Sequence, residues 1–422
     1  MNIPFKEKIP QYVRPWLWYG LAFLAYSIFY GYRLDFPSAP YFDEIHYVEA
    51  ARNLIERSGY VGEAHPYFGK YLIALSIAIF GDHAVAWRLP SFLSGFGIFV
   101  MVYLLADRLF QSRRAAWIAV FLLVFDGVFY TLARCALFNS VMLFLMLLSM
   151  YFFFNYALLN KWNLRTSFLL SGISAGLAVG TRWVALALFI LYAPLFLKLF
   201  LKSEDKFGFF KKTLLYFVLP AVTVYASLFL YIPFVRGYDV SAIWRLQEAM
   251  LRFHSTLSDY DSRAAAWWTW PLMLKPTWFY VRESAYVSVL AHHSVNAILC
   301  IGNPATFWSL PIVVFLSYIW RSAPKKILVL LLLGYMSQWL PWSLLERNQY
   351  FHYVHEIMPF GAMILALFLD HLWKRFRWGR WAVLVYLTVV LTLFIYWFPL
   401  LNGTQVSGDF FRHHLWLPGW YP

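Results

Sequence analysis

The chain has 422 residues, of which 61% are hydrophobic, 22% aromatic and only 13% charged, and its mean hydropathy is +0.58. Because an average soluble domain is about 25% charged, this composition excludes a soluble globular enzyme. The net charge of +14 does not indicate nucleic-acid binding, since Lys and Arg lie mainly in short connectors between apolar runs. The two cysteines, Cys135 and Cys300, have no metal-binding spacing and imply no disulfide framework.

Apolar runs of about the 20 residues needed to cross a bilayer recur along the whole chain. They predict an all-α integral membrane protein, a single polytopic domain over residues 1–422 with about 11 transmembrane helices. The runs are continuously apolar and do not alternate, unlike the strands of a transmembrane barrel. We expect the spans near 16–32, 85–107, 114–131, 136–158, 166–181, 183–201, 212–234, 304–321, 326–343, 356–373 and 380–398.

The connectors between these spans carry the orientation signal. Every second connector is rich in cations, and so is the N-terminal segment; the clearest groups are Arg108, Arg113 and Arg114, then Lys202, Lys206, Lys211 and Lys212, then Lys374, Arg375, Arg377 and Arg380. By the positive-inside rule this side is cytoplasmic, and the N-terminus with it. Three segments and the C-terminus then lie on the outer side: 33–84, 235–303 and the tail 399–422. The first apolar run lacks the layout of a cleaved signal peptide, so we expect it to remain as an anchor.

The first outer segment concentrates polar groups between Asp43 and Lys70. It holds the acidic pair Asp43 and Glu44, a His65-Pro66 step and a lysine. Polar residues are costly to keep at a membrane surface, so such a cluster indicates a functional site. The alternative is that Asp43 only caps an amphipathic helix. Consecutive residues on a helix point about 100° apart, so only one of the two acids can face a given reacting atom.

This stretch resembles the first external loop of the protein O-mannosyltransferase family, lipid-carrier-dependent glycosyltransferases of the GT-C type. The family's Asp-Glu pair and its His-Pro-x-x-Gly-Lys element are matched by Asp43, Glu44, His65, Pro66, Gly69 and Lys70. The resemblance implies a GT-C-like fold with amphipathic helices in the two large outer loops. It also implies transfer of a sugar, mannose in the family, from polyprenyl phosphate to a Ser/Thr hydroxyl of a secreted or envelope protein. Asp43 is then the expected base and Glu44 its neighbour in the site, and a single displacement by one carboxylate gives inversion.

The leaving phosphate requires cations, which guanidinium groups bind in a bidentate manner. Arg134 lies in a short turn at which the family has an Arg followed by Leu-Leu-Asp, although here Asn139 replaces that Asp. Arg182 matches a family Gly-x-x-x-Gly-Ser/Thr-Lys/Arg-Trp element. We expect Arg134, Lys70 and Arg182 to bind the donor phosphate. The simpler alternative is that Arg134 and Lys70 only anchor their segments at the membrane interface.

Further residues match family elements in the same order along the chain and are expected to shape the site: His65, Arg88, His254, Arg347 and His352. For Arg88, in the element Trp-Arg-Leu-Pro-Ser, anchoring the start of a helix is the favoured alternative. His65 is expected to orient its loop or to bond the phosphate. The second outer segment is too short to hold the soluble domain that eukaryotic family members insert there, so a bacterial inner (plasma) membrane is the expected location.

No cofactor is expected beyond the lipid-linked sugar, and no metal. Asp259-x-Asp261 spells the DxD pattern of metal-dependent sugar-nucleotide enzymes, but a lipid monophosphate donor does not need that metal, and no His/Cys cluster suggests zinc. The expected partners are the polyprenyl-phosphate sugar, a protein acceptor and membrane lipids, with no nucleic acid; the oligomeric state stays open. Two alternatives remain: a transferase that modifies a lipid, of the aminoarabinose-transferase type, and a transporter or flippase of lipid-linked sugar. A transporter should place its ionisable residues near mid-membrane.

Overall fold

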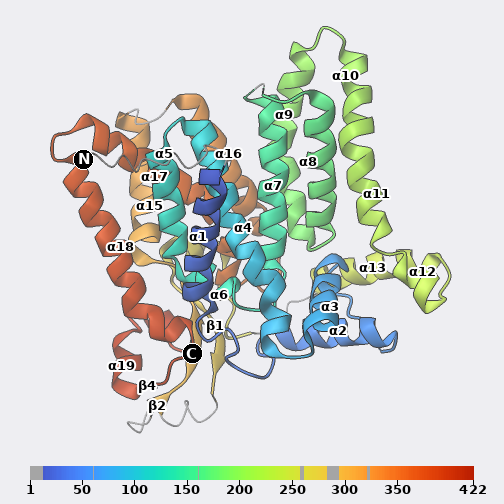
Figure 1. The fold of residues 1–422 in the computed structure, drawn as a ribbon, viewed down its shortest axis with the longest axis horizontal. Helices are drawn as coiled ribbons and strands as arrows, with labels where there is room; N and C mark the ends of the chain where they lie inside the picture. Colours follow the sequence, from blue (N-terminus) through green and yellow to red (C-terminus); the bar gives the residue numbers. More distant parts are fainter. Residues whose placement is uncertain (1–12, 60, 160, 257–260, 283–293, 321–323) are drawn as a thin grey trace, which may run out of the picture.

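The computed structural model describes residues 13–59, 61–159, 161–256, 261–282, 294–320 and 324–422. Long helices stand side by side, and the segments that we expect on the outer side gather at one end of the bundle, which we call the outer end (Figure 1). Within the described residues, six helices are long and apolar enough to cross a membrane, and shorter apolar helices accompany them. The protein is therefore an all-α integral membrane protein, as its composition predicts.

The bundle helices follow the predicted spans closely. They are α1 (Val13–Gly31), α4 (Ala84–Phe110), α5 (Arg113–Val124), α7 (Asn139–Ala157), α8 (Leu164–Val179), α9 (Leu188–Lys202), α10 (Lys206–Thr213) continued through the π-helical turn η2 (Leu214–Val218) into α11 (Leu219–Ser227), α15 (Pro304–Trp320), α16 (Lys325–Trp339), α17 (Met358–Arg375) and α18 (Gly379–Leu401). Each of the predicted spans overlaps one of these helices or continuous runs.

Two predicted spans are broken in the structure. The span expected at 114–131 is two helices, because Asp126 follows α5 and its carboxylate accepts the backbone N–H of Val128 at 2.9 Å, which starts α6 (Gly127–Leu132). The span expected at 212–234 ends as a helix at Ser227, and the short α12 (Tyr231–Arg236) follows it. In the predicted outer segment 33–84, the apolar helix α3 (Phe68–Phe80) was not predicted.

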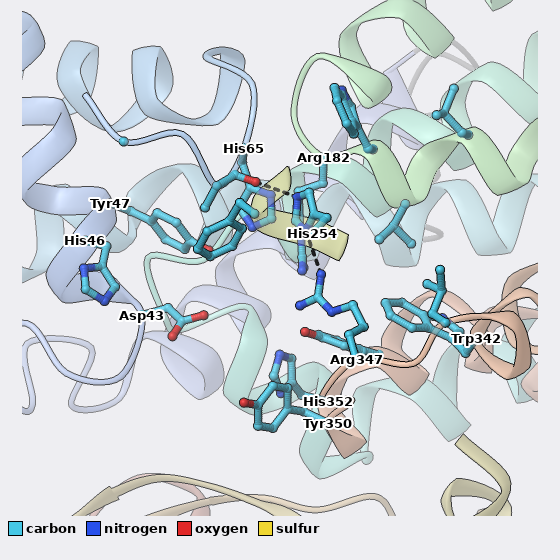
Figure 2. A pocket seen from close by; sticks show the side chains of 18 of the residues that line it. Asp43, His46, Tyr47, His65, Arg182, His254, Trp342, Arg347, Tyr350 and His352 are labelled. Carbon is cyan, nitrogen blue, oxygen red and sulfur yellow. Dashed lines mark hydrogen bonds between the residues drawn. The ribbon is translucent and has the colours of Figure 1, made fainter. Parts of the chain in front are cut away.

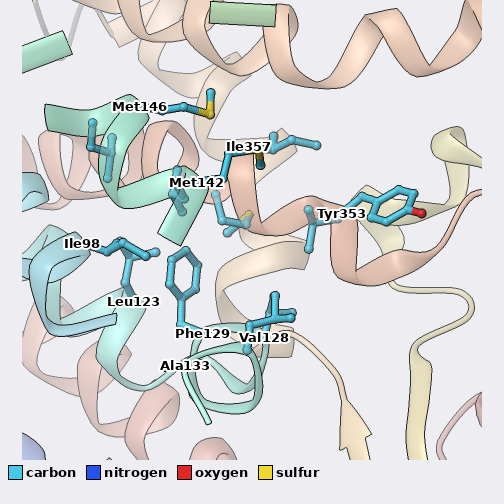
Figure 3. Close-up of a cluster of buried hydrophobic side chains, with 14 of the residues drawn as sticks. Ile98, Leu123, Val128, Phe129, Ala133, Met142, Met146, Tyr353 and Ile357 are labelled. Carbon is cyan, nitrogen blue, oxygen red and sulfur yellow. The ribbon is translucent and has the colours of Figure 1, made fainter. Parts of the chain in front are cut away.

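The centre of the bundle is formed by α4, α5, α7 and α17, with α1 packed against α4. Figure 3 shows side chains from these helices meeting around Phe129, with Met142 and Met146 on one side and Ile357 on another. The same cluster includes the buried Tyr353. Buried residues of the first outer segment, such as Tyr47 and Val48, belong to the same continuous apolar core as the bundle helices.

The outer end combines amphipathic helices with short strands. The amphipathic helices predicted in the two large loops are α2 (Glu44–Glu56) and α13 (Ser241–Thr256). Single turns of 3-10 helix lie at η1 (Trp183–Ala187), η3 (Trp267–Leu272), η4 (Leu340–Leu344), η5 (Phe351–Glu356) and η6 (Pro418–Trp420), and α19 (Gly408–His413) lies in the tail.

Strands at this end were not predicted. β1 (Thr277–Val281) pairs antiparallel with β3 (Ala297–Cys300), and β2 (Ser294–Val295) pairs with β4 (Val406–Ser407). The second pair joins the second outer loop to the C-terminal tail, so backbone hydrogen bonds hold these two segments together.

Candidate active site

A cavity of about 740 Å³ opens at the outer end of the bundle. Its walls come from α2, the loop before α3, η1 with the start of α9, the end of α13, and the η4–η5 segment (Figure 2). The polar residues lining it are Asp43, His46, Tyr47, Glu49, Glu63, His65, Arg182, His254, Arg263, Gln338, Arg347, Tyr350, His352 and Tyr353. The cavity therefore joins residues that are more than 300 positions apart in the chain.

Asp43 projects into this cavity from the start of α2 (Figure 2). It occupies the N-cap position, as the alternative interpretation requires, but its side chain makes no capping hydrogen bond. Burial raises the pKa of Asp43 above its ordinary value, and the nearby positive charge of Arg182 partly opposes this shift. The carboxylate is thus free to accept a proton from a bound group, and burial makes it a stronger base than an ordinary aspartate.

Glu44 does not line the cavity, although it follows Asp43 directly. Its side chain and that of Arg88 are both 0% exposed, and their ion pair is bidentate, with N–O distances of 2.9 and 3.0 Å. Glu44 also accepts the backbone N–H of Ala136 at 2.6 Å. Arg88 further donates to the carbonyls of Leu34 and Pro37 at 2.7 and 2.8 Å. This pair ties the first outer segment to α4 and to the turn before α7, so the acid predicted beside the base fixes the backbone that presents it.

Arg182 lies at the centre of the cavity wall (Figure 2). It follows the Gly180-Thr181 turn that ends α8, and it is only 6% exposed. Within the described residues its guanidinium makes no hydrogen bond or ion pair, and its Nε is buried without a partner. The guanidinium lies 5.7 Å from the centre of the Tyr353 ring. A buried guanidinium that no described carboxylate pairs with directly is costly to keep, so such an arginine indicates a site for an anionic ligand.

The other two predicted phosphate ligands lie outside the cavity lining. Arg134 donates to the Tyr130 hydroxyl and, at 2.9 Å, to the carbonyl of Arg33, and its guanidinium lies 4.5 Å from the Tyr130 ring. Lys70 is 2% exposed and donates to the carbonyls of Gly62 and His65 at 2.8 and 2.7 Å. Both cations thus hold backbone segments in place.

Of the residues predicted to shape the site, some line the cavity and one does not. His65, His254, Arg347 and His352 line the cavity, whereas Arg88 lies in the buried pair described above. Burial lowers the pKa of His65 well below its usual range. The Nδ1 atoms of His65 and His352 are buried without a hydrogen-bond partner. Unpaired buried nitrogens next to a cavity are available to a bound ligand.

Sequence reasoning missed Arg263 and gave no site role to Gln338 or Tyr353. Arg263 lines the cavity while it forms an ion pair with Asp261 at 2.9 Å, and Asp261 also accepts the Tyr350 hydroxyl at 2.7 Å. The proximity of Arg263 to the DxD pattern was the available signal. Within the described ranges, no group of three or more metal-ligating side chains comes together; Asp259 lies outside those ranges.

Comparison with known proteins shows which family has this sequence and fold. The family model described as dolichyl-phosphate-mannose-protein mannosyltransferase matches residues 79–236, and that of the C-terminal four-transmembrane region of protein O-mannosyltransferase matches residues 239–420. The polyprenol-phosphate-mannose–protein mannosyltransferase of Mycolicibacterium smegmatis is 26% identical, covering 90% of this chain and 87% of its own. The enzyme of the same name from Mycobacterium tuberculosis is 25% identical, with 90% and 86% covered.

Solved structures share the fold at low identity. The Saccharomyces cerevisiae protein O-mannosyltransferase Pmt1–Pmt2 complex bound to the sugar donor matches with a TM-score of 0.80 and 13% identity, over 96% of this chain and 93% of that one. ArnT from Cupriavidus metallidurans bound to undecaprenyl phosphate matches with a TM-score of 0.61 and 13% identity, over 94% and 74%. The fold is that of a GT-C-type membrane glycosyltransferase. The two family models together span most of the sequence, and the chain belongs to the protein O-mannosyltransferase family.

Proposed function

We propose that this protein transfers mannose from a polyprenyl-phosphate carrier to a Ser/Thr hydroxyl of a protein, with inversion at the anomeric carbon. The observation that carries the proposal is the pairing of an unpartnered buried cation, Arg182, with an unpartnered carboxylate, Asp43, in one cavity at the outer end. The named activity of the mycobacterial relatives supports the same donor and the same acceptor class.

In this mechanism Asp43 is the general base. It takes the proton of the acceptor hydroxyl while that oxygen attacks the anomeric carbon from the side opposite the phosphate. The bond between the anomeric carbon and the phosphate oxygen breaks, and its electron pair stays on the phosphate. The lipid phosphate thereby changes from a diester to a monoester and gains negative charge. Arg182 stabilises that charge in a site shielded from water, where a fixed donor is most effective.

Arg134 and Lys70 receive a different role in this proposal from the one their positions in the sequence suggest. Each already donates to backbone carbonyls, so we assign them to the support of the site and leave phosphate binding to Arg182. The active site faces the outer side of a bacterial inner membrane, where secreted or envelope proteins are available as acceptors. A lipid acceptor is the alternative within the enzyme class.

The test reconstitutes the full chain in vesicles with polyprenyl-phosphate-[3H]mannose, offering host envelope proteins and lipids together as acceptors. We expect label in protein, a loss of at least about 100-fold in kcat/KM for Arg182→Ala, and a smaller loss for Arg134→Ala. Label in the lipid fraction would instead support the lipid-modifying alternative. Carrier movement across the bilayer without any sugar transfer would overturn the enzyme proposal in favour of a flippase.

A further inference from the structure

His254, near the end of α13, connects two separate segments of the cavity wall (Figure 2). Its Nε2 lies 2.7 Å from the carbonyl oxygen of Ala64, in the loop before α3. Its Nδ1 lies 2.6 Å from Nη1 of Arg347, in the segment between η4 and η5. A single imidazole thus links three parts of the chain that are distant in sequence.

These two bonds define the protonation state of the ring. A carbonyl oxygen can only accept, so Nε2 of His254 must carry the hydrogen that it donates to Ala64. Arg347 can only donate, so Nδ1 must be bare and must accept. His254 is therefore neutral and held in one tautomer. Burial, followed by the positive charge of Arg347, lowers the pKa of His254 to about 4, which agrees with this assignment. Arg182 and His65 are the other titratable groups near the ring.

Arg347 retains donors that the protein does not use. A guanidinium has five N–H groups, and those of Arg347 make two contacts within the described chain, to His254 and, at 3.3 Å, to the carbonyl of Asn348. It forms no ion pair with a described carboxylate and lines the same cavity as Arg182. Figure 2 shows its guanidinium directed from the η4–η5 segment toward the middle of the cavity.

We propose that His254 is a positioning residue that aims Arg347 at the phosphate of the donor lipid, so that two arginines hold that phosphate. The inference rests on the proposed function. Arg182 comes from the turn after α8 and Arg347 from the segment between η4 and η5, so the anion is bound between two segments that are distant in sequence. The neutral imidazole suits this task because it orients the guanidinium without cancelling its charge, which a carboxylate partner would do.

Two substitutions separate the bonds of His254. His254→Asn leaves an oxygen acceptor close to the former Nδ1, so it retains the bond to Arg347 and loses the one to Ala64. His254→Gln places an amide N–H close to the former Nε2, so it retains the bond to Ala64 and loses the one to Arg347. We expect His254→Gln to raise the donor KM and to weaken binding of undecaprenyl phosphate about 10-fold, with a smaller effect on kcat. His254→Asn should change both quantities less.

Binding is measured on the full-length protein in phosphatidylcholine nanodiscs with undecaprenyl phosphate as the probe, and KM in the same discs. His413→Gln, an exposed histidine in the tail, is the matched control. Arg347→Gln should reproduce the defect of His254→Gln, and the double variant should be no worse than Arg347→Gln alone. If His254→Gln fails to fold, Arg347→Gln alone still tests whether Arg347 binds the phosphate.

Equal effects of the Asn and Gln variants, or additive effects of His254→Gln and Arg347→Gln, would overturn the inference and leave His254 a purely structural role. Competition by added phosphatidylglycerol would show that Arg347 binds lipid headgroups and not the donor. The proposed function has its own control: if the unsubstituted protein transfers no [3H]mannose from its polyprenyl-phosphate carrier to protein, the proposed function fails. If Arg182→Gln weakens binding and Arg347→Gln does not, only the present inference fails.

Discussion

At the scale of single residues, charged side chains that support the backbone differ from those proposed to act on the substrate in whether they have a partner within the protein. Glu44 and Arg88 satisfy each other and several backbone groups, and neither has an atom left for a substrate. By contrast, the side chain of Asp43 makes no capping hydrogen bond, Nε of Arg182 is buried without a partner, and both residues line one cavity. Because an unpaired buried charge is costly, unpaired groups are kept where a ligand completes them.

Replacing Asp43 with Asn should stop sugar transfer without stopping donor binding. The amide keeps the shape of the side chain but cannot take a proton, and loss of a general base typically costs about 10²–10⁴-fold in rate. We expect a fall of this size in kcat, with undecaprenyl phosphate binding retained. Asp35→Asn, at an exposed aspartate of the same outer segment, is the matched control and should leave kcat unchanged.

The raised pKa of Asp43 also predicts the pH dependence of the reaction. Because burial favours the neutral carboxyl, Asp43 stays protonated to a higher pH than an ordinary aspartate, whose pKa is 3.8. Activity requires the ionised form, so kcat should increase with pH through a midpoint above 3.8 and level off at higher pH. The measurement is kcat against pH in vesicles. An acid limb centred at or below 3.8 would exclude Asp43 as the titrating base.

The sequence predicts a site at the acidic pair, but it does not predict which of the two acids lines the cavity. A helical spacing shows that two consecutive acids diverge, and it does not show which one faces the cavity. The same limit applies to Arg134 and Arg182, which both lie in short turns between apolar runs. The carbonyl to which Arg134 donates belongs to Arg33, which is 101 residues away, so only the tertiary fold separates the two arginines.

At the scale of secondary-structure elements, the buried ion pair fixes α4 against the first outer segment. Arg88→Met would leave the Glu44 carboxylate buried without its cation, and breaking such a pair typically costs about 3–5 kcal/mol. We expect a clearly lower Tm for this variant in detergent. Arg52→Met removes an arginine from the partly exposed pair with Asp82, which should contribute about 1 kcal/mol or less. Similar Tm losses in both variants would argue against a special role for the buried pair.

A second element-scale prediction concerns the contact between α8 and α11. Gly176 faces the backbone of α11 so closely that an added Cβ would lie 2.5 Å from the carbonyl oxygen of Ala221. Small residues allow helices to approach in a membrane, where packing replaces the hydrophobic effect as the driving force. Gly176→Leu should therefore separate α11 from α8 and lower the Tm. Gly20→Leu, at a helix glycine with open space around it, should leave the Tm nearly unchanged.

The spans were predictable because each one is a long local pattern of apolar residues, and local patterns determine helices in a membrane. The breaks and the strands were not. The interruption after α5 depends on one side-chain cap from Asp126, inside a run that is otherwise apolar. The strand β2 is two residues long and pairs with β4 more than 100 positions later, so no local pattern indicates either strand.

At the scale of the whole molecule, the distribution of cations and the position of the cavity predict the same orientation in the membrane. The turns that join α9 to α10 and α17 to α18, with the cations on the helix ends beside them, lie at the end of the bundle opposite α2, α3 and α13 (Figure 1). The cavity lies at the other end, where the cations are spread over long segments and do not cluster in short turns. By the positive-inside rule, we expect the proposed site to lie across the membrane from the cytoplasm, on the side where exported proteins are found.

Cysteine labelling tests this orientation, because Cys135 and Cys300 are both buried and should give little background. Ser255→Cys lies at the end of α13, beside the cavity, and Glu204→Cys lies in the connector between α9 and α10; both positions are exposed. In intact spheroplasts a membrane-impermeant maleimide should label Ser255→Cys, and it should label Glu204→Cys only after permeabilisation. The opposite pattern would place the cavity in the cytoplasm, where an exported protein could meet it only before export. The proposed acceptor would then have to be a cytoplasmic protein or a lipid of the inner leaflet, although the chemistry of Asp43 and Arg182 would be unchanged.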